Sequence, residues 1–555
     1  MSEIVAILTL IFVASALLLI LASSRNLPVI PFYLLAGVLV GGVIQEELLL
    51  DLAQWGIAFL VFAFAVEVEP LSLREVGRDG AVTGVVQAAV VGAAMYAVGL
   101  TIGFDQVNAI YFAVAAALSS SLVTLGEFGT PERPQLAFER LSESIHFVED
   151  LIAIGVVLAL SAFVYSPEPA WLQIAAGLGL VVVAVAIREL AFERLASLSG
   201  GDVEIMMLTG VSFIVGFIAL SELAGVSIVV GAFAAGIAVA PGFPHEIEML
   251  DAIESLEDFF APIFFITLGA LLTVPSPGTI GLALLLVVSV VVLNPLVTIA
   301  VLRYRGYDPR TATLAGISLD QVSEFSLIIA IEAVLVQQIA PQLFEAIVLA
   351  AIVSMLLASY TGRHGEDVYG ALSRFRPFRS EPEWILDRSR VEEGLSDHVV
   401  VVDFGPLGRR VVEACEEAEH PYVVIESDPA LREALEAECE NFVFGDVSDR
   451  NTWRLANAKE ARAIVSVVSQ HRRSERILAV DTEADVIVRA DDEETALELL
   501  DAGATHVILP DALASDRLVE LVRTAIEEGE SALGGLASRE RAASRERATS
   551  RGPDE

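Results

Sequence analysis

Long apolar runs fill the first 360 residues of this 555-residue chain, whereas residues 361–555 carry a dense mixture of charges. The chain is 55% hydrophobic and yet has a formal net charge of -40, so its apolar and charged residues are segregated. About 20 apolar residues span a bilayer as a helix, which satisfies its own backbone hydrogen bonds in lipid. These runs therefore predict a polytopic α-helical membrane domain followed by a second domain outside the bilayer.

Hydropathy predicts about thirteen spans in the first part of the chain. They cover residues 4–22, 27–44, 52–69, 80–102, 107–126, 142–165, 170–187, 204–223, 225–241, 258–274, 277–303, 311–335 and 340–360. Arginines such as Arg25, Arg78, Arg133, Arg188 and Arg303 lie in alternate loops, which the positive-inside rule places in the cytoplasm. We therefore expect a multi-pass protein of the cell membrane with its N-terminus outside and its C-terminal domain in the cytoplasm.

Small and polar residues interrupt the fifth and twelfth spans, in the stretches ALSSSLVTLG and GISLDQVSEFS. Broken helices at corresponding places in two halves are typical of a transporter with inverted repeats and a site at the midplane. The two stretches lie seven spans apart, as such a repeat requires. The alternative interpretation is ordinary packing of small residues between helices.

Ionisable side chains at membrane depth are candidate functional residues, because each is costly to place there. Six of them lie deep in the predicted spans: Glu67, His146, Glu149, Asp150, Asp320 and Glu324. No arginine or lysine lies equally deep, so a fixed salt bridge cannot neutralise the adjacent Glu149 and Asp150.

Neighbouring residues on a helix point about 100° apart, so Glu149 and Asp150 cannot both face one small site. His146 precedes Asp150 by four residues and shares its face. A carboxylate such as Asp150, beside a serine-lined break, can hold either a monovalent cation or a proton, and this competition is sufficient for exchange. Alternatively, the two carboxyl groups are protonated and bonded between helices for structure.

Seven stretches of the membrane part resemble recurring motifs of the monovalent cation:proton antiporter family 2, especially its Kef-type members. They are IPFYLLAGVLVGG, LVFAFAVEVEP, ALSSSLV, FVEDLIAI, GAFAAGIAV, FFITLGALL and LDQVSEF, in the order in which that family has them. The resemblance covers nearly all of residues 1–360 and implies a cation:proton exchanger in that part.

The resemblance implies that Asp150 is the carboxylate that binds cation and proton. The helix break would add serine oxygens, and the third and twelfth helices would add acidic positions; these residues are Ser119, Ser120, Ser121, Glu67, Asp320 and Glu324. Kef-type proteins usually have glutamine at the position of Glu149, so the sequence does not determine the ion preference or whether exchange is electrogenic or electroneutral.

From residue 398 the pattern changes to alternating strands and helices, which predicts a parallel, doubly wound α/β fold. We expect a membrane domain at 1–360, a linker at 361–397, a Rossmann-like domain at 398–527 and a disordered charged tail at 528–555. VVVVDFGPLGRRV matches a dinucleotide loop with Asp403 in the first glycine position and Gly405 and Gly408 in the other two. Glu426, eighteen residues after Gly408, would bind a ribose hydroxyl.

Together with FVFGDVSD and GATHVILP, this loop resembles the N-terminal domain of regulators of K⁺ conductance, also called TrkA-N. The resemblance implies a regulatory ligand such as AMP, NAD(H) or ATP, held by Gly405, Gly408, Glu426, Asp428 and Asp446. An anionic Asp403 would repel a pyrophosphate, so a nucleotide-free regulatory or dimerisation domain is the alternative.

Composition excludes other classes. Cys415 and Cys439 are the only cysteines, which allows neither a disulfide framework nor a CxxC metal site. A basic nucleic-acid footprint is absent. Lys459 is the only lysine, and such an acidic, lysine-poor composition is typical of salt-in halophiles, with base-composition drift as the alternative.

The sequence thus predicts a homodimeric antiporter that exchanges K⁺ or Na⁺ for H⁺ across a lipid bilayer. It would be no enzyme, would need no obligatory cofactor and would be gated by its cytoplasmic domain. The alternatives are a glutathione-gated K⁺ efflux system, a sensor that transports nothing, and a membrane-anchored NAD-dependent oxidoreductase. Against the oxidoreductase, the sequence offers no substrate domain.

Overall fold

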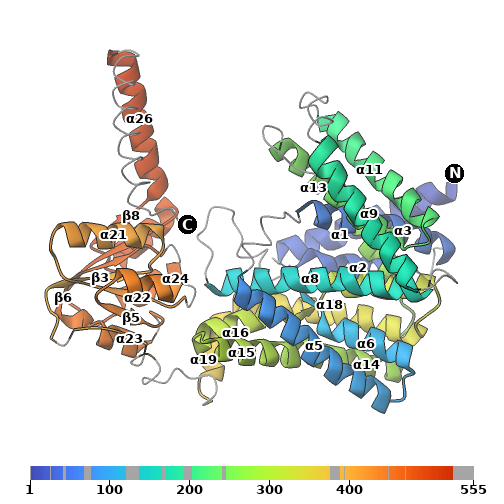
Figure 1. Cartoon of the computed structure of the whole chain (residues 1–555), viewed down its shortest axis with the longest axis horizontal. Coiled ribbons are helices and arrows are strands. Elements are labelled where there is room, and N and C mark those ends of the chain that lie inside the picture. The colour runs from blue at the N-terminus through green and yellow to red at the C-terminus, as the bar shows by residue number, and fades with distance from the viewer. Residues whose placement is uncertain are drawn as a thin grey trace. The chain divides into compact units, whose positions relative to one another are not determined.

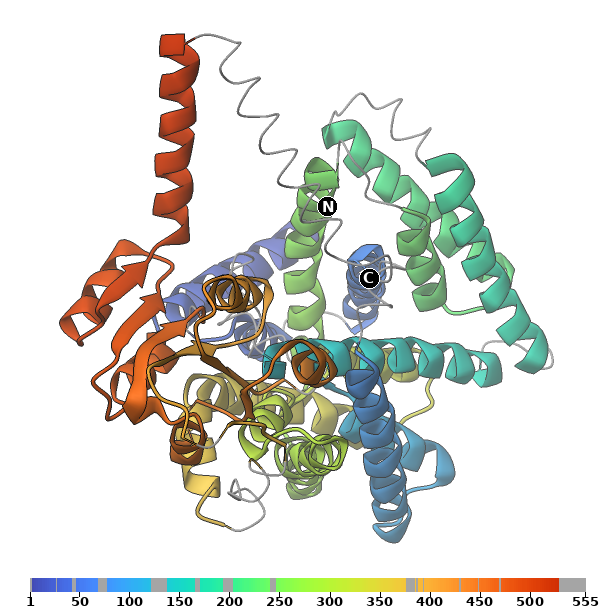
Figure 2. The same cartoon turned by 60° about the vertical axis from the view of Figure 1, so that its left-hand side comes forward.

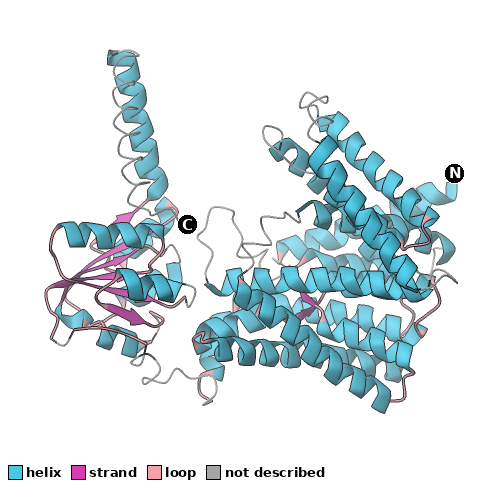
Figure 3. Cartoon of the chain, viewed as in Figure 1, coloured by secondary structure: helices cyan, strands magenta, loops and turns pink. Residues whose placement is uncertain are grey.

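The computed structural model describes residues 2–25, 27–41, 46–67, 77–120, 137–164, 170–192, 203–239, 246–375, 385, 388–392, 394–428, 431–447, 449–468 and 471–528. The chain divides into two compact units that join between Arg379 and Ser380. The first, the membrane unit, is helical, and the second, the cytoplasmic unit, is built around a sheet (Figure 3).

Sixteen helices of the membrane unit are described. They are α1 (Ser2–Ser24), α2 (Val29–Val40), α3 (Glu46–Glu67), α5 (Arg78–Thr101), α6 (Gln106–Ala117), α8 (Ala137–Val164), α9 (Ala170–Ile187), α11 (Val203–Leu223), α12 (Ile228–Ala238), α13 (Glu246–Ala270), α14 (Pro277–Val288), α15 (Asn294–Arg305), α16 (Pro309–Ile317), α17 (Glu324–Leu335), α18 (Pro341–Arg363) and α19 (Gly365–Leu372). Within the described ranges, five helical segments are long and apolar enough to cross a membrane by length and composition alone.

These helices fall where hydropathy predicts the spans. The eleventh predicted span comprises α14 and α15, joined by a π-helical turn at Ser289–Leu293 that precedes Pro295. The twelfth span is broken as predicted, into α16 and α17. The fifth span is helical only to Ala117, and its predicted end, 121–126, lies outside the described residues.

Packing sorts these helices into two layers (Figure 1). We call α5, α6, α8 and α14 to α18 the crossing layer, and α1 to α3, α9 and α11 to α13 the panel layer; the turned view of Figure 2 shows the same grouping. Within the panel, α2 and α13 approach so closely that a Cβ on Gly37 or Gly269 would collide with the backbone of the other helix. Small residues therefore allow close helix contact in this layer.

The cytoplasmic unit contains a six-stranded parallel sheet in the order β5-β4-β3-β6-β7-β8. Its strands are β3 (His398–Val402), β4 (Tyr422–Glu426), β5 (Phe442–Phe444), β6 (Ala461–Ser466), β7 (Asp485–Arg489) and β8 (His506–Ile508). Its helices are α21 (Pro406–Glu417), α22 (Arg432–Glu438), α23 (Arg450–Leu455), α24 (His471–Leu478), α25 (Glu493–Asp501) and α26 (Pro510–Glu528).

Both faces of this sheet are buried. Val400 and Val402 belong to one apolar core, whereas Val401, between them, belongs to the other. Continuous valine runs are typical of parallel strands covered by helices on both sides. The predicted doubly wound α/β fold is therefore confirmed. The strand order reverses between β3 and β6, and ligands of such folds bind at the carboxyl ends of the strands beside this point.

Candidate functional site

Two short extended segments cross in the membrane unit, each at the end of a broken helix. β1 (Ser119–Ser120) follows α6, and β2 (Gln321–Val322) separates α16 from α17. They pair antiparallel, with Ser119 opposite Val322 and Ser120 opposite Gln321. The Ser323 N–H also donates to the Leu118 carbonyl oxygen over 3.3 Å. The first two residues of the SSSLVT stretch and the DQVSEF stretch, far apart in the sequence, therefore meet at one place.

At the end of α6, side chains from neighbouring helices donate hydrogen bonds to backbone carbonyl oxygens. Gln87 of α5 donates its amide to the Ala117 carbonyl oxygen over 3.1 Å, and Asn294 of α15 donates to that of Ala116 over 3.2 Å. Such partners are required because an unpaired backbone group in lipid costs several kcal/mol. Gln87 and Asn294 are not among the predicted site residues, although an amide inside an apolar run is the signal by which the sequence marks them.

Glu149 of α8 is tied to the crossing. One of its carboxylate oxygens, Oε2, accepts the Ser119 N–H over 2.8 Å and the Ser119 hydroxyl over 2.6 Å. The side chain is 0% exposed, and its other oxygen, Oε1, has no hydrogen-bond partner among the described residues. Glu149 therefore anchors α8 to the first residue of β1.

Asp150, the next residue, points elsewhere. Its Oδ2 lies 3.3 Å from Nε2 of His146, which confirms the shared face expected for these two residues. Asp150 is 3% exposed, and its Oδ1 has no hydrogen-bond partner within the described ranges. The charges of Glu149 and Glu324 both act on it. Asp150 is thus a buried carboxylate within electrostatic range of two other acids, and one of its oxygens has no hydrogen-bond partner among the described residues.

The remaining predicted residues of the membrane site are placed as follows. Ser120 lies in β1, and Glu324 is the first residue of α17. Asp320 is 1% exposed, and its Oδ2 accepts the hydroxyl of Thr361 from α18 over 2.6 Å. Ser121 lies outside the described residues, as does the side chain of Glu67 at the end of α3.

Gln321 is a site residue that sequence reasoning missed. It lies in β2, opposite Ser120, and is 0% exposed. Neither its amide nitrogen nor its amide oxygen has a hydrogen-bond partner among the described residues. The DQVSEF stretch shows that Gln321 is a polar residue inside a predicted span, but no local pattern shows that its amide is buried opposite Ser120. No group of three or more His, Cys, Asp or Glu side chains arranged for a metal ion occurs in the described part of the chain.

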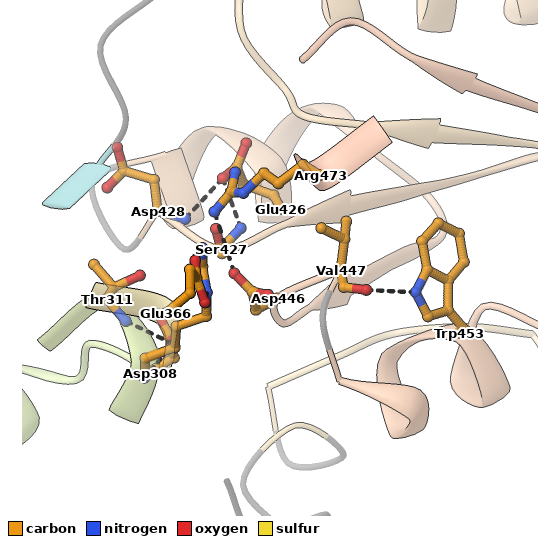
Figure 4. Close-up of polar contacts among 11 residues, drawn as sticks. Asp308, Thr311, Glu366, Glu426, Ser427, Asp428, Asp446, Val447, Trp453 and Arg473 are labelled. Carbon is orange, nitrogen blue, oxygen red and sulfur yellow. Dashed lines mark hydrogen bonds and ion pairs between the residues drawn. The ribbon is translucent and has the colours of Figure 1, made fainter. Parts of the chain in front are cut away.

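The cytoplasmic unit gathers acidic side chains at the carboxyl ends of its strands (Figure 4). Glu426, the last residue of β4, accepts the N–H of Ser427 over 2.6 Å and that of Asp428 over 2.7 Å through Oε1. Burial raises the pKa of Glu426 to about 7, and the neighbouring Asp403 charge adds to this. Asp446, after β5, lies 3.2 Å from Arg473 of α24. The five predicted nucleotide-binding residues lie at this edge of the sheet: Gly405 and Gly408 in the loop after β3 and the first turn of α21, Glu426 at the end of β4, Asp428 just after it, and Asp446 after the adjacent β5.

A helical membrane unit whose broken helices cross beside buried carboxylates is the architecture of a secondary ion transporter. Residues 8–363 match the family model "Sodium/hydrogen exchanger, transmembrane", and residues 399–510 match the TrkA-N domain. The chain therefore belongs to the sodium/hydrogen exchanger family and carries a TrkA-N domain. It is a multi-pass membrane transporter rather than an enzyme.

Two curated antiporters are similar to this chain along most of its length, and one solved antiporter is similar in fold over a shorter part. The chain is 25% identical over 538 residues to a putative cation/proton antiporter, YbaL, of Escherichia coli, covering 91% of this chain and 94% of that one. It is 26% identical to a putative K⁺ efflux antiporter, KefB, of Alkalimonas amylolytica, covering 88% and 77% of the two chains. The solved sodium proton antiporter MjNhaP1 of Methanocaldococcus jannaschii is 13% identical with a TM-score of 0.46, covering 68% of this chain and all of that one.

Proposed function

We propose that this protein exchanges a monovalent cation, K⁺ or Na⁺, for H⁺, and that the two ions compete for Asp150. The observation that carries the proposal is the Asp150 carboxylate, which is 3% exposed and has an oxygen without a hydrogen-bond partner in the described part of the chain. In such a site a carboxylate is stabilised either by a bound cation or by a proton.

The surroundings of Asp150 support competition rather than permanent neutralisation. No arginine or lysine contacts it among the described residues, and its ion-pairing partner is the imidazole of His146. The buried Arg310 lies at the start of α16, where it pairs with Glu366 of α19 instead. In this proposal Ser119, Ser120, Gln321 and the crossing backbone would supply oxygens for a hard cation. Glu149, Asp320 and Glu324 would supply further acidic groups, and the family resemblance adds Glu67 to them.

Exchange in proteoliposomes tests this proposal. The purified chain is reconstituted with an internal pH indicator, and dissipation of an imposed pH gradient is followed after addition of K⁺ or Na⁺. We expect Asp150→Asn to abolish dissipation with both ions, because an amide cannot exchange a proton for a cation. Glu222→Gln is the matched control, since it removes an exposed carboxylate of α11. Exchange by Asp150→Asn at the wild-type rate would refute the assignment.

The ion itself is part of the proposal. We favour K⁺ over Na⁺ because one relative is named for K⁺ efflux, so K⁺ should give the larger signal in the same vesicles. A glutathione-gated efflux system is the second candidate, and it predicts that glutathione inside the vesicles alters the K⁺ signal. The acid-rich, lysine-poor composition supports parallel measurements at high salt, where we expect activity to be retained.

We also propose a division of labour along the chain, in which residues 1–360 carry out exchange and residues 398–527 regulate it from the cytoplasm, with the N-terminus outside. The two parts would work in a homodimer. The regulatory ligand would lie at the carboxyl ends of β3, β4 and β5, against the acids Glu426, Asp428 and Asp446. The position of the strand-order reversal supports this location.

A further inference from the structure

The loop after β3 keeps the backbone path of a dinucleotide loop but replaces its first glycine. Asp403 stands there with a φ of 79°, a left-handed conformation that glycine adopts freely and aspartate tolerates. The last glycine is required by packing, because a Cβ on Gly408 would collide with the carbonyl oxygen of Asp403. The replacement therefore changes the chemistry of the loop and leaves its course in place.

The Asp403 side chain turns back onto its own loop. Its Oδ2 accepts the Gly405 N–H over 3.3 Å, and Glu426 Oε2 accepts the neighbouring Phe404 N–H over 2.8 Å. Pro406, the first residue of α21, has no N–H to offer. In a dinucleotide site, donors of this loop and the N-terminus of the following helix hold the diphosphate. Here two carboxylates of the chain itself occupy two of the loop's donors, the N–H groups of Phe404 and Gly405.

The electrostatics act in the same direction. Asp403 places a negative charge at the N-terminus of α21, which is the position that favours an anion. Glu426, 4% exposed, and Asp428, 6% exposed, lie beside it. The charges of Asp403 and Asp428 both act on Glu426. A diphosphate would add two further negative charges, and like charges at close range in a partly buried site repel strongly.

Arginines on the adjoining helices are engaged by other acids. Arg409 of α21 covers the ring of Phe404 and lies 2.9 Å from a carboxylate oxygen of Glu438. Arg473 of α24 lies 3.2 Å from Asp446. Each of these two guanidiniums already has a carboxylate partner, so neither offers a phosphate a positive charge that is not already balanced by an acid. A pyrophosphate therefore does not fit this loop as it stands.

We infer that Asp403 takes the place of a ligand phosphate, so that the wild-type domain excludes dinucleotides and nucleoside diphosphates from the N-terminus of α21. The inference rests on the regulatory role proposed for this domain and narrows its ligand to one that places no phosphate there. Asp403, in the first glycine position of the loop, is thus a residue that determines ligand specificity.

Restoring the glycine tests the inference directly. ADP, NADH and adenosine are titrated into the full chain in detergent, in wild type, Asp403→Gly and Asp403→Asn. Glycine accepts the left-handed φ without strain, so this variant should fold. We expect it to bind ADP and NADH at least about tenfold more tightly than wild type, with adenosine unchanged. Asparagine tolerates the same φ and keeps an oxygen for Gly405, so it should show a smaller gain.

Two results would overturn the inference. Wild-type chain that binds ADP as tightly as the glycine variant would show that Asp403 does not exclude phosphate. An equal gain for adenosine would show that the side chain acts on the whole pocket. Both results are independent of transport, because the same preparations report ion exchange separately after reconstitution.

Discussion

Glu149 and Asp150 are adjacent acids, yet the structure gives them different partners, and Glu149→Gln tests whether their roles differ as well. Both donors of Ser119 reach the same oxygen of Glu149. A glutamine side chain keeps one carbonyl oxygen that can accept both bonds, so the anchor of α8 to β1 should survive. The substitution then removes little except the negative charge beside Asp150.

The size of the effect follows from Coulomb's law. Carboxylates of adjacent helical residues diverge by about 100° and lie roughly 7 Å apart. At an effective dielectric constant of about 20, an anionic Glu149 attracts a cation at Asp150 by about 2 kcal/mol. Loss of this attraction weakens cation binding by about 30-fold. We therefore expect the half-saturating cation concentration to rise by about this factor while exchange persists at saturating cation.

The assay is the proteoliposome exchange measurement, carried out at a pH at which protons do not compete with the cation. Wild type, Glu149→Gln and Asp150→Asn are compared across a wide range of cation concentrations. Complete loss of exchange in a folded Glu149→Gln protein would refute the separation of roles. An unchanged half-saturating concentration would refute the premise that Glu149 is an anion when the cation binds.

Two further predictions follow from contacts outside this pair. Ser227, at the start of α12 in the panel layer, donates a hydrogen bond to Glu332 of α17 in the crossing layer. The prediction assumes that this bond forms in only one of the two arrangements of the layers during transport. Ser227→Ala then shifts the equilibrium between the two arrangements by about 1.5–3 kcal/mol and alters the exchange rate. Ser221→Ala, which removes a bond within one helix, is its control, and equal effects of the two variants would contradict the prediction. In the cytoplasmic unit, burial and then the Asp403 charge raise the pKa of Glu426 from 4.5 to about 7. Because the folded domain holds this proton more tightly than the unfolded chain, the contribution of Glu426 to stability is fully present below pH 4.5 and is lost, by about 3 kcal/mol, as pH rises through 7. Hydrogen exchange of β4 in the full chain measures this loss, and Asp403→Asn should reduce it.

Much of the fold was predictable because its signals are local. An apolar run predicts a membrane helix whatever packs against it. ALSSSLV and DQVSEF predict helix breaks because clusters of small and polar residues at corresponding places in two halves are typical of a transporter's broken helices. The valine runs of the cytoplasmic unit likewise predict strands that are covered on both faces. Thirteen spans remain a prediction, since five described helical segments meet the length and composition of a membrane span.

The site was predictable in its residue types but only partly in its contacts. Asp150 and His146 share a face because they are four residues apart, which helix geometry dictates. The partner of Glu149 could not be inferred in this way, because Ser119 is separated from it by thirty residues of chain. Gln321 was passed over for the same reason, since its burial depends on a strand pairing with a distant span.

By itself, the sequence determined that this chain is a helical membrane exchanger joined to a doubly wound α/β domain, because hydrophobic periodicity and motif order need no long-range information. Only the tertiary structure decided that Glu149 is held by Ser119, that Glu332 links the two helix layers, and that Asp403 accepts the Gly405 N–H of its own loop. These are hydrogen bonds whose partners are chosen by packing, and packing brings together residues that no local pattern relates.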